Sequence, residues 1–223
     1  MAVAPIHFAA HTRDVETLRR LLAEGVSPDV AGGDYDRTPL LFLCVSPDAG
    51  GDLAACFKLL RDAGANLEAV NRNGFTPLLY AANVANTKIA SLLLEAGANV
   101  NAANLRGWTA LHFAAHKSAD CVEVLLAAGA SLNLRDFDGR TPFGLALAWG
   151  LPRSWPLFLR AGAEIPTNIT HPYIARVRNA GGFKKYAQAH LVRVTKTVES
   201  VLGLPARPAC LVVEFWLHHA GYY

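Results

Sequence analysis

The sequence predicts an all-α solenoid, in which pairs of short helices stack one after another and are followed by a helical C-terminal cap. Two phrases recur along the 223 residues at nearly constant spacing, and both favour this fold. The first begins with threonine, recurs at intervals of 38, 33 and 32 residues, and comprises Thr38-Pro39-Leu40-Leu41, Thr76-Pro77-Leu78-Leu79, Thr109-Ala110-Leu111-His112 and Thr141-Pro142-Phe143-Gly144. The second keeps the same period and comprises Gly25-Val26-Ser27, Gly64-Ala65-Asn66, Gly97-Ala98-Asn99, Gly129-Ala130-Ser131 and Gly162-Ala163-Glu164. A period of about 33 residues is typical of stacked repeats, which predicts a binding surface rather than an active site.

The third repeat illustrates why each element is expected. Thr76 can cap a helix that begins at Pro77, because the amide hydrogen that proline lacks would be unpaired in a first turn anyway. The leucines at 92–94 supply the apolar stripe of a second helix. Gly97 follows directly, at the position where a chain leaves a helix with positive φ, and Gly74 has the same freedom in a tight hairpin turn. Each repeat is therefore expected to contain a hairpin and two helices, and no repeat can bury its own apolar stripe alone.

These residues resemble the ankyrin-repeat family, whose unit is a hairpin loop followed by two antiparallel helices. The resemblance covers about residues 2–168, predicts a repeat domain over residues 1–168, and divides it into repeats at 2–34, 35–70, 71–103, 104–135 and 136–168. The third and fourth repeats follow the family pattern closely, whereas the first lacks the threonine and the fifth departs from the pattern after Trp149. The second carries an insertion from Ser46 to Asp52, which is either a specific contact or simple drift. The resemblance implies a non-enzymatic module that binds a partner protein on a concave face.

In the family this face is formed by hairpin tips and by the ends of the inner helices. Aromatic side chains and arginines are the types that concentrate binding energy at interfaces. By position, the resemblance places the following candidates there: Tyr35, Arg37, Arg72, Phe75, Asn83, Arg106, Trp108, His116, Phe137 and Arg140. The alternative is that the rings cover neighbouring hairpins or pack under the C-terminal segment. Three further aromatic residues precede small residues inside the inner helices and are predicted to be core: Phe42, Tyr80 and Phe113.

Residues 169–223 form a separate C-terminal segment with helices expected over 171–181 and 183–202, a turn at Leu204-Pro205, and a last apolar helix. This segment either caps the open end of the solenoid or binds a partner. Its order of elements resembles ankyrin adaptors that end in a SOCS box or an F-box-like element, which implies an alternative function as a substrate-recognition adaptor of a cullin-type ubiquitin ligase, with cullin or elongin subunits as partners. Thr195 departs from that pattern, since cysteine or serine is expected there. The residues predicted to contact either the repeats or such a partner are Leu204, Pro205, Leu211, Phe215 and Trp216.

Composition sets further limits on the class of protein. The chain is 52% apolar and 17% charged, yet it contains no run of 18 apolar residues, so no membrane span is expected. The first ten residues lack a charged lead and are interpreted as a first helix rather than a signal peptide. The four cysteines are widely separated, and those at 44, 56 and 121 are predicted to be buried thiols. A cytoplasmic location is expected, with a nuclear one as the alternative.

Charge and motifs give little sign of chemistry. Residues 171–223 carry seven Lys/Arg against two Asp/Glu, which is interpreted as a solvated helical face. The alternative is a contact with an acidic partner or with nucleic acid, but the net charge is modest and no platform of aromatic residues is interleaved with the basic ones, so nucleic acid is not expected. His112 and His116 have the four-residue spacing that can bind zinc, but no nearby carboxylate or cysteine would complete a site, so neither a metal nor another cofactor is expected. The sequence contains no phosphate-binding glycine loop and no nucleophile elbow. We therefore predict no catalytic residues and no enzymatic activity.

Overall fold

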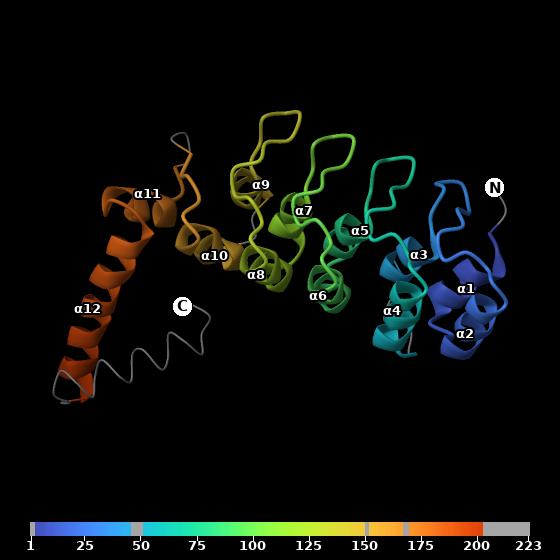
Figure 1. Cartoon of the computed structure of the whole chain (residues 1–223). Coiled ribbons are helices and arrows are strands. Elements are labelled where there is room, and N and C mark those ends of the chain that lie inside the picture. The colour runs from blue at the N-terminus through green and yellow to red at the C-terminus, as the bar shows by residue number, and fades with distance from the viewer. Residues whose placement is uncertain (1–2, 46–50, 150–151, 167–169, 203–223) are drawn as a thin grey trace. The chain divides into compact units, whose positions relative to one another are not determined.

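The computed structural model describes residues 3–45, 51–149, 152–166 and 170–202 of the chain (Figure 1). Contacts divide the chain into two compact units, called here unit 1 (Met1–Leu151) and unit 2 (Pro152–Tyr223). Within the described ranges the regular structure is helical, with two isolated β-bridges in hairpins. The helices of unit 1 are α1 (Pro5–Thr12), α2 (Val15–Ala23), α3 (Pro39–Val45), α4 (Leu53–Asp62), α5 (Pro77–Asn83), α6 (Thr87–Glu95), α7 (Ala110–Lys117), α8 (Ala119–Ala127) and α9 (Pro142–Trp149). Those of unit 2 are the 3-10 helix η1 (Pro152–Ser154), α10 (Trp155–Arg160), α11 (Pro172–Asn179) and α12 (Phe183–Leu202).

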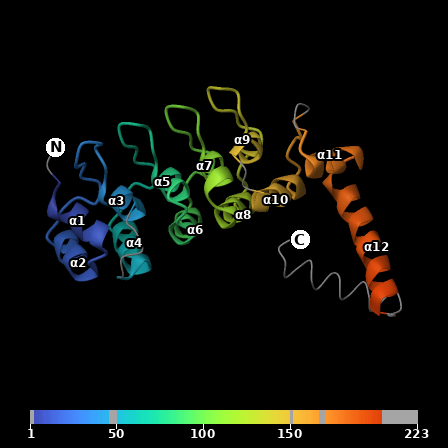
Figure 2. The same ribbon diagram turned by 180° about the vertical axis from the view of Figure 1, so that it is seen from behind.

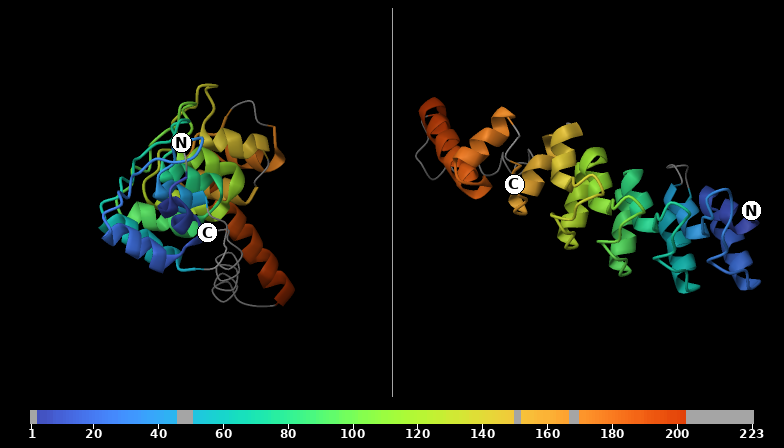
Figure 3. Two further views of the ribbon diagram at one scale, coloured as in Figure 1. Left: turned by 90° about the vertical axis from the view of Figure 1, so that its right-hand side faces the viewer. Right: turned by 90° about the horizontal axis from the view of Figure 1, so that it is seen from above.

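Unit 1 is a two-layered stack of helical pairs. The first helices of the repeats, α1, α3, α5, α7 and α9, contact one another in sequence order, and the second helices α2, α4, α6 and α8 form a parallel row behind them. The hairpins between successive pairs all project from the same side of the stack (Figures 1 and 2). Seen from above, the repeats follow one another in register (Figure 3). This arrangement confirms the predicted all-α solenoid.

Local sequence explains where the helices begin and end. The hydroxyl of Thr76 accepts a hydrogen bond from the Leu79 amide at 3.3 Å, with Pro77 in the first turn of α5, as predicted. The chain leaves α6 and α8 through Gly97 and Gly129, whose φ angles of 90° and 82° confirm the expected left-handed exits. Because β-carbon-bearing residues seldom adopt this conformation, glycine sets the length of each second helix.

The hairpins use one Asx side chain in the same way three times. The Oδ1 atom of Asn104 accepts hydrogen bonds from the amides of Arg106 at 2.9 Å and Trp108 at 3.0 Å. Asn71 and Asp136 accept the corresponding pairs of amides in the preceding and following hairpins. Each of these carboxamide or carboxylate groups thus fixes a turn that would otherwise leave two amide hydrogens without a partner.

Adjacent hairpins are also joined by single backbone hydrogen bonds. The amide of Leu105 donates to the carbonyl of Asn73 at 3.4 Å, and the amide of Phe137 donates to the carbonyl of Arg106 at 3.1 Å. The amide of Arg72 makes the same kind of bond to Tyr35 at 3.2 Å. The hairpins of unit 1 therefore form a connected row, and a change in one can be felt by the next.

The core of unit 1 lies between the helical layers. Tyr80 and Phe113 are buried, as predicted, whereas Phe42 is only half-buried. Three cysteines of the described ranges, at 44, 56 and 121, are buried free thiols, which confirms their prediction. Burial raises the pKa of Cys56 to about 11, so this thiol is protonated and unreactive at neutral pH. Cys210 lies outside the described residues.

Unit 2 contains the two helices expected from residues 171–202. Gly181 and Gly182, with φ angles of 78° and 111°, end α11 and turn the chain into α12, which confirms the predicted break. Ile174 and Val177 of α11 are fully buried. The guanidinium of Arg178 donates to the carbonyl of Pro166 at 2.6 Å and ties α11 to the preceding segment. None of the helices in the described ranges has the length and apolar character needed to cross a bilayer.

Three predictions concern the end of the repeat domain, the insertion in the second repeat and the C-terminal contacts. The repeat pattern pairs α9 with α10 in residues 136–168, whereas the compact units divide between these helices, so the domain boundary at 168 stays a prediction. Residues 46–50 of the insertion lie outside the described ranges. So do Leu204, Pro205, Leu211, Phe215 and Trp216, and their role as cap or partner contacts also stays a prediction.

Candidate protein-binding surface

Aromatic rings from three successive repeats lie against one another on the hairpin side of unit 1. The ring of Phe75 lies 4.9 Å from that of Tyr80 and 5.2 Å from that of Phe113, measured between centroids. The ring of Trp108 lies 4.9 Å from Phe113 and 5.7 Å from Trp149. We call these five residues the aromatic row. Such tilted contacts at 4.5–7 Å are favourable for aromatic pairs, so the row is a preformed apolar surface.

The row borders a groove between the hairpins of the third and fourth repeats. Its volume is about 560 Å³, and it is lined by Asn73, Phe75, Asn104, Leu105, Arg106, Trp108 and Phe113. Three of the residues selected from sequence, Phe75, Arg106 and Trp108, therefore come together at one place. Phe75 and Trp108 are half-buried: their rings pack on Phe113 of the inner helix α7, and they still line the groove.

Four lining residues were not among the ten predicted contacts: Asn73, Asn104, Leu105 and Phe113. Leu105 is 65% exposed at a hairpin tip, and Phe113 was assigned to the core. Phe113 is indeed buried, but its ring forms the floor between Phe75 and Trp108. A buried position and a groove-lining position are compatible here, since the groove reaches down to the inner helix.

The four predicted arginines differ in their surroundings. Arg72 forms an ion pair with Asp36 of the preceding hairpin at 2.6 Å, and the guanidinium of Arg37 lies 5.3 Å from the ring centre of Tyr80. Arg106 is exposed, and no carboxylate among the described side chains forms an ion pair with it. Arg106 therefore offers an unneutralised charge at the edge of the aromatic row.

Arg140 is occupied within its own hairpin. It pairs with Asp136 at 2.8 Å and also with Asp138, and its guanidinium lies 5.8 Å from the ring centre of Trp108. Burial alone would raise the pKa of Asp136, but the amide and guanidinium of Arg140 outweigh it and lower that pKa. The contacts of Arg140 thus stabilise its own hairpin and the ring of Trp108.

The two histidines on α7 have structural surroundings. His112 is buried, accepts the Thr109 amide at Nδ1 at 3.1 Å, and donates from Nε2 to the carbonyl of Arg140 at 3.1 Å. The ring of His116 meets Trp149 edge-on at 4.6 Å. Burial lowers the pKa of both histidines. Among the described residues, no group of three or more histidine, cysteine or acidic side chains could hold a metal ion.

The remaining candidates lie around the groove without lining it. Tyr35 and Phe137 are at hairpin tips of the second and fifth repeats, 48% and 81% exposed. Asn83 is half-buried at the end of α5. Trp149, which was not among the predicted contacts, ends α9, is exposed, and lies 5.7 Å from Trp108 between ring centroids. Of the ten residues selected from sequence, only Phe75, Arg106 and Trp108 line the groove, and the role of all ten in binding stays a prediction.

Together, the stacked helical pairs and this hairpin surface define a helical repeat protein. A family model described as ankyrin repeats, in three copies, matches residues 41–136 and 103–167. The chain belongs to the ankyrin-repeat family, which confirms the resemblance and identifies the solenoid as a protein–protein interaction module. The match ends at residue 167, so the similarity of the C-terminal segment to SOCS-box or F-box-like ends stays a prediction. No curated protein matches the sequence.

Proposed function

We propose that the protein acts without catalysis, by binding a segment of a partner protein in the groove between the hairpins of the third and fourth repeats. The observation that supports this most is the combination of Phe75, Trp108 and the unpaired Arg106 around one hollow. The aromatic row supplies apolar area that is already ordered, so a ligand would not have to arrange it. The partner segment that fits carries an apolar side chain for the groove and an acidic one for Arg106.

The other predicted contacts form a rim in this proposal. Side chains that surround a central anchor exclude water and add specificity, while the anchor supplies most of the binding energy. This rim consists of Tyr35, Arg37, Arg72, Asn83, His116, Phe137 and Arg140. Substitutions there are expected to have smaller effects on affinity than substitutions at Phe75 and Trp108.

The test compares three full-length baits in an affinity pull-down from lysate, followed by titration of the recovered partner. The first bait is unaltered, the second carries Phe75→Ala and Trp108→Ala, and the third carries Phe8→Ala as a control. Phe8 is an exposed aromatic residue of α1 that does not line the groove. Thermal unfolding of each bait verifies that it is folded.

A partner retained by the first and third baits, and bound at least about thirtyfold more weakly by the second, would support the groove, since hot-spot residues contribute about 2 kcal/mol or more. Equal binding to all three folded baits would contradict it. A charge reversal, Arg106→Glu, should weaken the same partner if its segment is acidic.

The adaptor alternative requires a separate observation. It depends on Leu204, Pro205, Leu211, Phe215 and Trp216, none of which belongs to the described part of the chain. Cullin or elongin subunits recovered with the full chain, and lost after Leu204→Ala with Pro205→Ala, would favour it. Without such subunits, the plain interaction module is the simpler function.

A further inference from the structure

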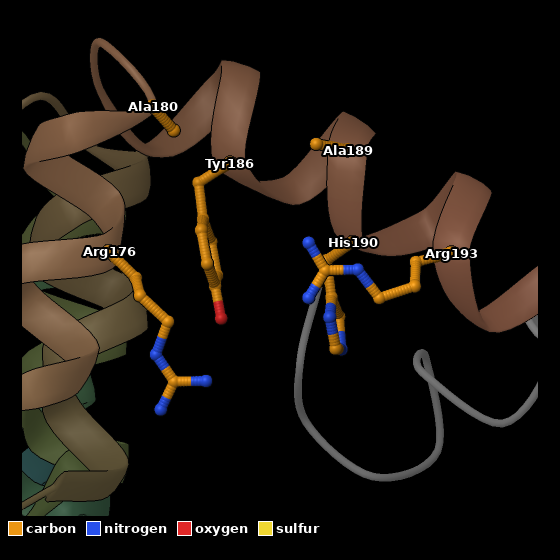
Figure 4. A pocket seen from close by; sticks show the side chains of 6 residues that line it. All are labelled: Arg176, Ala180, Tyr186, Ala189, His190 and Arg193. Atoms are coloured by element: carbon orange, nitrogen blue, oxygen red, sulfur yellow. The ribbon is translucent and has the colours of Figure 1, made fainter.

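The successive helices α11 and α12 of unit 2 carry a small basic hollow that the proposed groove does not involve. Its side chains converge from two helices (Figure 4). Tyr186, His190 and Arg193 follow one another at intervals of four and three residues on α12, which places them on one face of that helix. Arg176 reaches toward them from α11. The hollow has a volume of about 140 Å³ and is lined by Arg176, Ala180, Tyr186, Ala189, His190 and Arg193.

Ring contacts and a hydrogen bond hold two of the lining side chains, Tyr186 and Arg176, in place. The ring of Tyr186 lies parallel to that of His190, with 5.9 Å between centroids, and meets Tyr173 of α11 edge-on at 5.6 Å. The Nε atom of Arg176 donates to the carbonyl of Pro172 at 3.3 Å. This bond uses only one donor of the guanidinium and leaves its terminal nitrogens for another acceptor.

The charge of the hollow is not neutralised by the described side chains around it. No carboxylate among them forms an ion pair with Arg176 or Arg193. Residues 171–202 contain six Lys/Arg and one acidic residue, Glu199. Two guanidinium groups, an imidazole and a phenol hydroxyl around one small space form a donor-rich site for an anion.

We propose that this hollow binds the phosphoryl group of a phosphorylated side chain on a partner protein. The planar donor forks of two arginines match phosphate oxygens, and clusters of arginine recognise phosphorylated motifs in this way. The hollow, at about 140 Å³, has room for a phosphoryl group. A phosphomonoester carries close to two negative charges at neutral pH, which two guanidinium groups balance better than they would a singly charged phosphodiester.

A nucleic-acid strand fits this site less well. Binding of single strands relies on a basic groove that follows the backbone and on open aromatic faces for the bases. Here one aromatic face of Tyr186 is taken up by His190, and the basic hollow is short. Nucleic acid is therefore the less suitable ligand, and one probe of the following experiment tests for it.

The experiment titrates the full chain by calorimetry with three probes. These are a blocked Gly-phosphoserine-Gly peptide, inorganic phosphate, and a short single-stranded oligothymidylate without a terminal phosphate. The test variant carries Arg176→Gln and Arg193→Gln. The control carries Lys184→Gln and Lys196→Gln, which removes the same charge from exposed positions of α12 that do not line the hollow.

We expect saturable binding of the phosphopeptide that weakens at least about tenfold in the arginine variant, because the charged hydrogen bonds to the phosphoryl group are lost. The lysine variant should differ from the unaltered chain by less than about threefold, because exposed charges interact weakly through water. Equal weakening in both folded variants, or no saturable binding, would overturn the site. Tighter binding of the oligothymidylate would assign it to nucleic acid, and equal binding of inorganic phosphate would overturn the phosphoprotein partner.

Discussion

Gly74 and Gly139 occupy equivalent turn positions in two hairpins, with φ angles of 73° and 75°, but their surroundings differ. A β-carbon at Gly74 would lie 2.9 Å from the backbone nitrogen of Leu105, whereas one at Gly139 would meet nothing within 4 Å. Gly139→Ala should therefore lower the free energy of unfolding by about 1–2 kcal/mol, the penalty of the left-handed conformation. Gly74→Ala should lower it further, because the next hairpin must move away. Denaturant unfolding measures both, and equal losses would contradict the proposed contact between hairpins.

His112 and His116 make a second prediction at this scale, on the dependence of stability on pH. In the folded chain burial lowers their pKa below the ordinary 6.5. Between the lowered pKa and 6.5 the unfolded chain binds protons that the folded chain does not, so stability rises with pH in this window. The stabilisation is complete above about pH 6.5 and is lost as the pH falls toward the folded-state pKa. Asp136, whose ordinary pKa is 3.8, contributes only at lower pH.

The measurement is the free energy of unfolding between pH 7.5 and 5.5, for the unaltered chain and for His112→Leu. Leucine is the residue that the third repeat has at the equivalent position, Leu79. The unaltered chain should lose stability on acidification, and the variant should show a flatter profile from a lower starting point, since the carbonyl of Arg140 loses its donor. An unchanged slope in the variant would show that His112 does not carry the effect.

At the scale of the element, three of the hairpins each depend on one Asx side chain, Asn71, Asn104 or Asp136. Asn104→Ala removes the acceptor of the Arg106 and Trp108 amides, and we expect it to lower the free energy of unfolding by about 1–3 kcal/mol. Asn104→Asp keeps an acceptor oxygen, as Asp136 does natively in the next hairpin, and should preserve most of the stability. Thermal or denaturant unfolding compares the two. A loss that is as large for aspartate as for alanine would argue against the acceptor role.

The same substitution links the element to the proposed groove. The hairpin held by Asn104 carries both Arg106 and Trp108, so a loosened turn should weaken the partner through both residues. Asn104→Ala should therefore reduce affinity for the partner identified by pull-down while leaving the phosphopeptide titration of unit 2 unchanged. A parallel loss of both activities would indicate general unfolding instead.

Elements were more predictable than the contacts between them. The Thr-Pro start of α5 and the glycine that ends α6 follow from local backbone chemistry, which acts within a few residues and is legible in one repeat. The exposure of Leu105 and the meeting of Trp108 with Trp149 depend on how one repeat is placed on the next. That placement is set by packing across the layers, and the position of a residue within its repeat does not encode it.

The hairpin of the second repeat also shows that local sequence does not predict every turn. Asp36 adopts a φ of 51° where the other hairpins have glycine, and its carboxylate pairs with Arg72 of the next repeat. Aspartate tolerates this conformation better than most residues. The sequence therefore has no glycine at this position to mark the turn, and the ion pair that joins the two hairpins could only be found from the arrangement of both.

At the scale of the whole molecule, the principal helix contacts among the described residues of unit 1 join neighbours. The helices α1, α3, α5 and α7 each pack on the adjacent first helices and on the second helix of their own repeat, so stability is close to a sum of repeats and of the interfaces between them. A weakened central repeat should then divide the stack into parts that unfold separately, whereas a weakened surface residue should not.

The same leucine-to-alanine substitution at a buried position, Leu111, and at an exposed position, Leu105, tests this idea. Leu111 is fully buried in α7, at the centre of contacts with α5 and α9, while Leu105 is exposed. Leu111→Ala should lower the free energy of unfolding by about 2–5 kcal/mol and reduce the denaturant m value, because the repeats on either side no longer unfold as one unit. Leu105→Ala should change stability by less than about 0.5 kcal/mol and leave m unaltered.

Hydrogen exchange of the Leu111→Ala variant adds a spatial prediction: amides of α5, α7 and α9 should lose protection before those of α1 and α2. Uniform loss along unit 1, with an unchanged m value, would instead mean that the repeats unfold as a single cooperative body even when their central interface is weakened.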